Sequence, residues 1–107
     1  IRPHADGSPV VYHMGDTDIF GDMGLIGRLY EPTVGLVPIG DRFTMNPITA
    51  ATACRNFFEF KTIIPCHYGT FDLLIPDADP FVNAMADQSD RVKVPYIGQT
   101  LDLSASV

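Results

Sequence analysis

Residues 34–41 read Val-Gly-Leu-Val-Pro-Ile-Gly-Asp, a short apolar run that Gly40 closes. An apolar run of this length, bounded by turn residues, is typical of a buried strand. Two similar apolar runs lie on either side of it along the chain, at residues 10–14 and 62–66. The segments between these runs carry apolar residues at helical spacing, so strands and helices alternate. This alternation predicts an α/β fold class.

The segment between the first two runs has one apolar helical face. Its members recur at steps of four, three and four residues, and they are Ile19, Met23, Ile26 and Tyr30. The same segment contains Gly21, Gly24 and Gly27. Each glycine weakens a helix by about 1 kcal/mol relative to alanine.

Two further helices begin at recognisable start signals. Asn46 followed by Pro47 is an N-cap with proline at the first helical position, and Asp79-Pro80 begins the other helix. The inward-facing residues that we expect are Ala50, Ala53, Cys54 and Phe57 in the first helix, and Phe81, Ala84 and Met85 in the second. The runs Arg91 to Val94 and Thr100 to Leu103 predict a terminal pair of strands.

Composition restricts the class of protein. The chain has 107 residues, enough for one small domain, and its net charge is −6 with no cluster of basic residues. Nucleic acid is therefore not an expected partner. No apolar run approaches the roughly 20 residues that a membrane span needs. Cys54 and Cys66 lack metal-pair spacing, and we interpret them as reduced thiols in the cytoplasm, with a single disulfide as the alternative.

Polar side chains follow each of the three predicted strands. Asp16 follows the first strand, and the other two loops carry Asp41, Arg42 and Thr44, then His67, Tyr68 and Thr70. In α/β layers the loops at the carboxyl ends of neighbouring strands line one crevice. Asp41, beside Arg42, is expected near that crevice. Arg42, Thr44, Tyr68 and Thr70 are the candidates for its substrate-facing wall.

The residues taken singly leave two interpretations of each candidate. Asp16 can hold two cations with its two oxygens, or it can close an Asx-turn with its own backbone. His67 can bind a metal ion, or it can be a hydrogen-bonded histidine at a strand end. His13 can orient a neighbouring ligand through a hydrogen bond, or it can be a histidine packed within the strand.

Four motifs, in the same order along the chain, resemble one family. They are Tyr12-His-Met-Gly-Asp-Thr17, Gly21-Asp-Met23, Leu36-Val-Pro-Ile-Gly-Asp-Arg-Phe-Thr-Met45 and Ile64-Pro-Cys-His-Tyr-Gly-Thr-Phe71. The family is the group of predicted metal-dependent hydrolases within the metallo-β-lactamase superfamily. Ascorbate-phosphate lactonases and N-acyl-phosphatidylethanolamine phospholipases are similar at a greater distance.

The resemblance implies a fold and two metal ligands. The family fold is a four-layer αββα sandwich with its site at one edge, between the two sheets. Residues 1–107 would be the C-terminal half of that one domain, with a mixed sheet and covering helices. Asp16 matches the aspartate that bridges two metal ions, which also gives it the catalytic role. His67 matches the last metal-binding histidine.

The chain also departs from the family pattern. It lacks the HxHxDH signature and the further histidine that follows it, and it starts at Ile1 without an initiator methionine. A catalytic zinc typically has three protein ligands, and an exposed apolar sheet face needs a cover. We therefore expect the missing N-terminal half, or a second chain carrying HxHxDH, to complete the fold and site. A homo-oligomer is a further arrangement that the sequence allows.

The function implied is metal-dependent hydrolysis of a small-molecule substrate. Two divalent ions, zinc first with manganese or iron as alternatives, would activate a water that attacks an ester, lactone, amide or phosphodiester. On this interpretation the chain by itself is inactive. The alternative is a non-catalytic structural or interaction subunit derived from the same fold.

Overall fold

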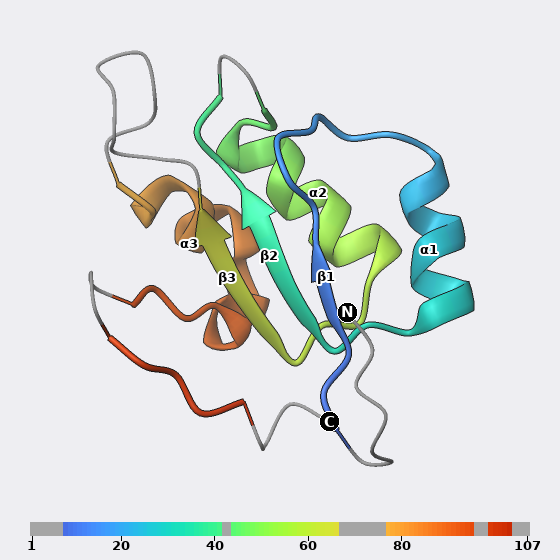
Figure 1. Ribbon diagram of the computed structural model, residues 1–107. Coiled ribbons are helices and arrows are strands. Elements are labelled where there is room, and N and C mark those ends of the chain that lie inside the picture. The colour runs from blue at the N-terminus through green and yellow to red at the C-terminus, as the bar shows by residue number, and fades with distance from the viewer. Residues whose placement is uncertain (1–7, 42–43, 67–76, 96–98, 104–107) are drawn as a thin grey trace.

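The computed structural model describes residues 8–41, 44–66, 77–95 and 99–103. Strands and helices alternate, as the sequence predicts (Figure 1). The elements, in chain order, are β1 (Val11–His13), α1 (Asp22–Tyr30), β2 (Val34–Pro38), α2 (Pro47–Phe57), β3 (Thr62–Cys66), α3 (Asp79–Met85) and the 3₁₀ helix η1 (Ala86–Arg91). The longest of these helices, α2, has 11 residues, and no described helix is long and apolar enough to cross a membrane.

The three strands form one sheet in the order β1-β2-β3, so neighbours in sequence are neighbours in space. Val34 of β2 pairs with Val11 on one side and with Thr62 on the other, and both pairings are parallel. The mixed sheet that we expected is therefore not present among the described strands. The reason is that a helix lies in each connection and returns the chain to the same edge, so the next strand starts in the same direction.

The predicted terminal pair of strands is also wrong in the described part of the chain. Arg91 belongs to η1, residues 99–103 form no strand, and Val92 makes only an isolated parallel bridge with Ile63. Lys93 donates its amide hydrogen to the Ile63 carbonyl at 2.9 Å. The next donor in a parallel ladder would be Pro95, which has no amide hydrogen, and pairing stops there.

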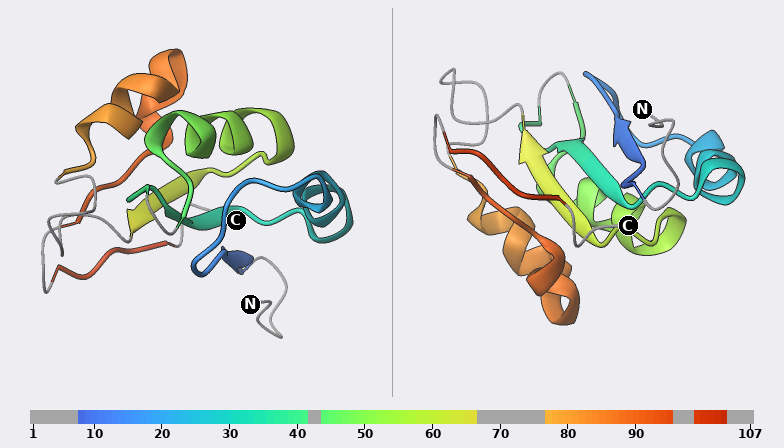
Figure 2. Two further views of the ribbon diagram at one scale, coloured as in Figure 1. Left: turned by 90° about the horizontal axis from the view of Figure 1, so that it is seen from above. Right: turned by 60° about the horizontal axis from the view of Figure 1, so that its bottom comes forward.

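The core lies between the sheet and its helices. Figure 2 shows α2 and α3 over one face of the sheet, and α2 contacts both α1 and α3. Val37, Ile39 and Ile63 point into this core and are 0% exposed. Leu36 and Ile64 alternate to the opposite face and are only partly buried.

Helix α2 begins as its sequence predicts. The Asn46 side chain accepts a hydrogen bond from the Thr49 amide at 2.9 Å, and Pro47 occupies the first turn. The small residues Ala50, Ala53 and Cys54 are all fully buried, as the sequence predicts for the inward face of this helix. A close approach occurs within β2, where a Cβ on Gly35 would lie 2.5 Å from the Phe60 ring.

Helix α1 buries most of its expected face. Met23 is fully buried, and Ile26 and Ile19, which precedes the helix, pack against the core, whereas Tyr30 at the helix end is 55% exposed. Two glycines of α1 lie close to the end of α2. A Cβ on Gly27 would lie 2.1 Å from the Phe57 carbonyl oxygen, whereas one on Gly24 would lie 3.2 Å from the Phe57 ring. Gly27 therefore permits a contact between α1 and the last residue of α2 that any side chain at this position would prevent.

A series of alanine substitutions tests this contact. Gly27→Ala should destabilise the protein by about 1–3 kcal/mol, because the obstacle is backbone and cannot rotate away. Gly21→Ala is the matched control, since a Cβ there meets nothing within 4 Å. Urea unfolding with a constant m-value measures both changes. A gain in stability for Gly27→Ala, which helix propensity alone would give, would show that the close approach does not require glycine.

Candidate metal centre

The three strands end at one edge of the sheet, and hydrogen bonds join the segments that leave it (Figure 1). Met14 donates its amide hydrogen to the Leu36 carbonyl at 3.2 Å, and Ile39 donates to the Cys66 carbonyl at 3.0 Å. Beyond the strands, Met45 donates to the Thr17 carbonyl at 3.0 Å. The described residues that leave β1 and β2 therefore lie together at the edge where β3 ends, as the sequence predicts for neighbouring parallel strands.

Asp16 lies at this edge, after a turn at Gly15. Gly15 has a φ of +69°, a left-handed conformation that glycine adopts without steric cost. The side chain of Asp16 is exposed. Burial raises the pKa of the Cys66 thiol, and the negative charge of Asp16 raises it further. Asp16 from the β1 loop is therefore near the end of β3, although β2 lies between the two strands.

His67 is the residue that follows Cys66 in the chain. His67, Tyr68 and Thr70 lie outside the described residues, and so does Arg42. The roles predicted for these four side chains stay predictions. What the structure does describe is the strand that leads to His67, which ends beside the Asp16 loop.

The middle loop is organised around Asp41 and Thr44. Asp41 is exposed with a φ of +66°, and its amide hydrogen is donated to the Met45 carbonyl at 3.0 Å. Thr44 is only 7% exposed, and its hydroxyl lies within 3.4 Å of the Asp41 and Met45 carbonyl oxygens. Thr44 thus holds this turn closed. That it also faces a substrate stays a prediction.

The side chain of His13 is exposed, so the interpretation of His13 as a histidine packed within the strand is wrong. Its Nδ1 atom accepts a hydrogen bond from the Gly15 amide at 3.0 Å. In a neutral imidazole that accepts at Nδ1, the proton resides on Nε2. The sequence contained the signal for this contact, a histidine two residues before a glycine that precedes the candidate ligand.

The metal-ligating side chains of the described residues form no group of three or more. Asp16 nonetheless fits a divalent cation, because it is an accessible carboxylate at the shared strand edge. Carboxylate oxygens and imidazole nitrogens together suit zinc and similar ions. That Asp16 and His67 bind such an ion stays a prediction.

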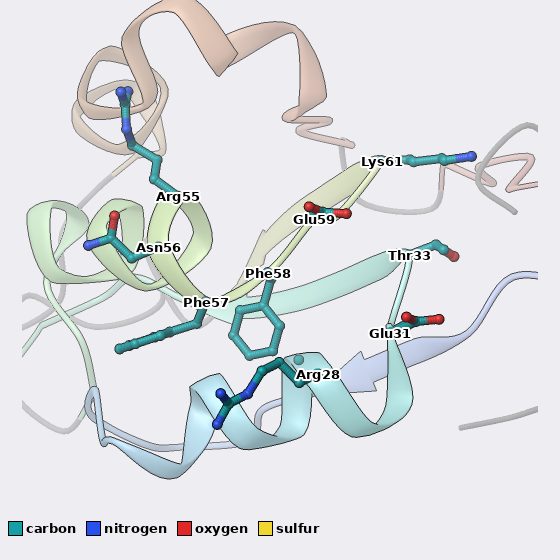
Figure 3. A pocket seen from close by; sticks show the side chains of 10 residues that line it. Arg28, Glu31, Thr33, Arg55, Asn56, Phe57, Phe58, Glu59 and Lys61 are labelled. Atoms are coloured by element: carbon teal, nitrogen blue, oxygen red, sulfur yellow. The ribbon is translucent and has the colours of Figure 1, made fainter.

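Cationic side chains elsewhere in the structure have other roles. Figure 3 shows a hollow of about 590 Å³ between α1 and the end of α2, bordered by Thr33 and Lys61 at the starts of β2 and β3. Arg28, Arg55 and Lys61 extend from it in different directions, so they do not converge on one ligand. Arg28 and Arg55 lie in the last turns of their helices, where cations complement the helix dipole.

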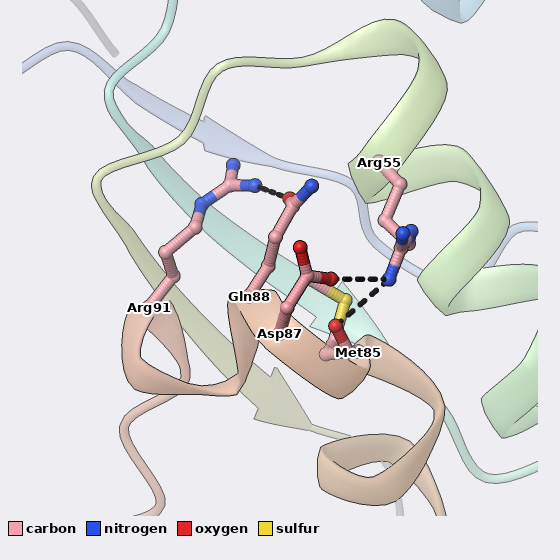
Figure 4. A network of polar contacts seen from close by, with 5 residues as sticks. All are labelled: Arg55, Met85, Asp87, Gln88 and Arg91. Atoms are coloured by element: carbon pink, nitrogen blue, oxygen red, sulfur yellow. Dashed lines mark hydrogen bonds and ion pairs between the residues drawn. The ribbon is translucent and has the colours of Figure 1, made fainter.

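Two arginines connect the last helices to the core (Figure 4). Arg55 donates to the Met85 carbonyl at 2.9 Å and approaches Asp87 at 3.4 Å. Arg91 donates to the Phe60 carbonyl and to Gln88. These contacts tie α3 and η1 to α2 and to the segment before β3, and they lie away from the Asp16 edge.

Comparisons with known proteins agree with this geometry. No family model matches the chain. Among curated proteins it is 52% identical over 99 residues to a UPF0173 metal-dependent hydrolase of Azorhizobium caulinodans. It is 56% identical over 99 residues to one of Methylobacterium nodulans. In both cases the match covers 92% of this chain and 42% of the relative, so the chain spans about two fifths of their length.

A solved structure shows the same fold. It is Igni18, described as a novel metallo hydrolase from the hyperthermophilic archaeon Ignicoccus hospitalis, with a TM-score of 0.78 and 35% sequence identity. The match covers 86% of this chain and 40% of that one. The described α/β layer is therefore part of a metallo-β-lactamase-type hydrolase fold. Within that class the chain is homologous to the UPF0173 metal-dependent hydrolases, which confirms the resemblance seen in its motifs.

Both cysteines are free thiols, as expected, and their reactivity tests the placement of Asp16. Asp16→Asn removes a negative charge that raises the pKa of Cys66, so more thiolate forms at pH 8. Alkylation of Cys66 should accelerate roughly two- to threefold, the effect of one charge several ångströms away in water. Mass spectrometry of iodoacetamide-treated, metal-free protein measures the rate.

Two internal controls accompany this experiment. Asp18→Asn, in the same loop, should leave the Cys66 rate unchanged. Cys54 should stay unlabelled in the native protein, because burial raises its pKa to about 12 even though Arg91 lowers it. An Asp16→Asn rate equal to that of the parent would mean that the carboxylate is not near Cys66.

Proposed function

We propose that this chain contributes part of a binuclear metal-dependent hydrolase centre, in which Asp16 and His67 are its ligands. The observation that carries the proposal is the shared edge at which β1, β2 and β3 end, where Met14 bonds to Leu36 and Ile39 bonds to Cys66. Asp16 follows β1 at this edge, and β3 leads directly to His67. The relatives' description as metal-dependent hydrolases supports it. So does the described fold, which matches that of a metallo hydrolase.

The chemistry proposed for Asp16 follows from its geometry. Its carboxylate has two oxygens that can serve as metal ligands, and the residue is exposed at the sheet edge. Two bound divalent ions would supply a water of lowered pKa and would polarise the oxygen under attack. Zinc is the proposed metal, with manganese or iron as alternatives, since carboxylate and imidazole ligands do not distinguish them.

The remaining ligands are proposed to come from outside these 107 residues. Two protein ligands are fewer than the three that a catalytic zinc typically has. We propose that a segment carrying HxHxDH, in the same polypeptide or in a second chain, provides the others and covers the partly buried face with Leu36 and Ile64. On this proposal the chain alone is inactive.

The proposed substrate is a small ester, lactone, amide or phosphodiester. Arg42, Thr44, Tyr68 and Thr70 are the proposed wall around it. A metallo-hydrolase fold hosts several of these activities, so the choice among them depends on side chains at the site and not on the fold.

Substitution of the two ligands in the complete protein tests the proposal. Asp16→Ala and His67→Ala should each reduce the metal content and lower turnover by a hundredfold or more, since even the outer partners of metal ligands contribute about 10–100-fold. Elemental analysis and a panel of ester, lactone and phosphodiester substrates give the two readouts. Asp22→Ala, an exposed acid in the first turn of α1, is the control that should change neither.

Unchanged turnover and metal content in Asp16→Ala would contradict the proposal. The alternative function, a non-catalytic structural or interaction subunit, predicts a different result. In that case the purified protein contains a second chain and no metal.

A further inference from the structure

We infer that His13 is a positioning residue for Asp16: its neutral imidazole accepts the Gly15 amide hydrogen and so fixes the turn that presents the carboxylate. This inference rests on the proposed function, because it concerns the residue proposed to bind metal. It adds a residue that does not touch the metal and that the motif resemblance does not assign. The hydrogen bond between the Gly15 amide and His13 Nδ1 measures 3.0 Å.

Two backbone hydrogen bonds to the rest of the molecule flank Asp16 in the chain. On one side the Met14 amide is bonded to Leu36 in β2, and on the other the Thr17 carbonyl accepts from Met45. The Gly15 amide lies between these two attachments. Its partner is not a strand or a neighbouring loop but the side chain of His13, two residues earlier.

Glycine at position 15 leaves space that a side chain would occupy. A Cβ at this position would meet nothing within 4 Å, and the φ of +69° lies in a region that glycine enters and leaves freely. The backbone has two soft dihedral angles at each residue, so rotation at Gly15 redirects Asp16. The bond to His13 therefore restrains the turn through which the chain enters Asp16.

The position of His13 excludes a simple packing role. Its side chain is exposed at the end of β1, whereas Met14, its neighbour, is only 8% exposed and belongs to the core. Removing the imidazole thus takes away an acceptor and little buried surface. The Nδ1 atom of histidine and the Oδ1 atom of asparagine are equally far from the backbone, and asparagine commonly accepts from the amide two residues on.

These features define a matched pair of variants in the complete protein. His13→Ala removes the acceptor, and His13→Asn restores one at the same place. Zinc affinity, measured by competition with a chelator, should fall about 10–100-fold in His13→Ala, as for other groups that orient metal ligands. In His13→Asn it should stay within about threefold of the parent. The thermal midpoint of the metal-free protein should be nearly the same in all three.

A spectroscopic measurement tests the contact without metal. Two-dimensional ¹H–¹⁵N spectra of the metal-free protein should show His13 as the Nε2–H tautomer, with Nδ1 as the acceptor. The opposite tautomer would overturn the inference. Equal losses of affinity in His13→Ala and His13→Asn would also overturn it, because the acceptor would then not be what matters.

The two proposals fail in distinguishable ways. If Asp16→Ala abolishes zinc binding while His13→Ala binds as the parent does, the positioning role is wrong and the proposed ligand stands. If Asp16→Ala binds zinc as the parent does, the proposed function is wrong, and the positioning role fails with it. A His13→Ala variant that lowers the thermal midpoint of the metal-free protein by several degrees would assign His13 a structural role instead.

Discussion

The parallel pairing of β2 with both of its neighbours is the constraint on which the candidate centre depends. Strands on either side of a central strand are roughly 10 Å apart, so residues in β1 and β3 do not touch directly. Residues that follow β1 and β3 can nevertheless contribute to one site, because the carboxyl ends of both strands lie at the same edge of the sheet. Leu36 of β2 and Ile39 just beyond it bond to Met14 and Cys66, respectively, at that edge.

Close approach between backbones and rings sets the positions of the elements around β2. Gly35 lies under the Phe60 ring, which stacks on Phe58 with ring centroids 4.6 Å apart. Gly27 lies against the Phe57 carbonyl. In a sequence these glycines look like weak points of a helix and a strand. In the fold they are places where no side chain fits, because packed interiors leave no room for even one methyl group.

The arginine contacts that hold the last helices to the core lie apart from the candidate metal centre. Arg55 and Arg91 bond to backbone carbonyls that tie the last helices to the core, and their charges lie away from the strand edge. In the described part of the loop after β1, a short local bond joins the Gly15 amide to His13. Local hydrogen bonds of this kind commonly orient metal ligands.

Much of this architecture was determined by the sequence alone, because it depends on local periodicity. The three strands, the Asn46 cap and the buried stripe of α2 follow from neighbours within a few residues, and the motif order identified the family. The tertiary structure decided the rest. Whether 91–94 and 100–103 pair and whether His13 packs or accepts a bond depend on the three-dimensional arrangement of the chain. Direction and partner are properties of three-dimensional contacts, so only the folded chain could show that the residues leaving β1 and β3 meet at one edge of β2.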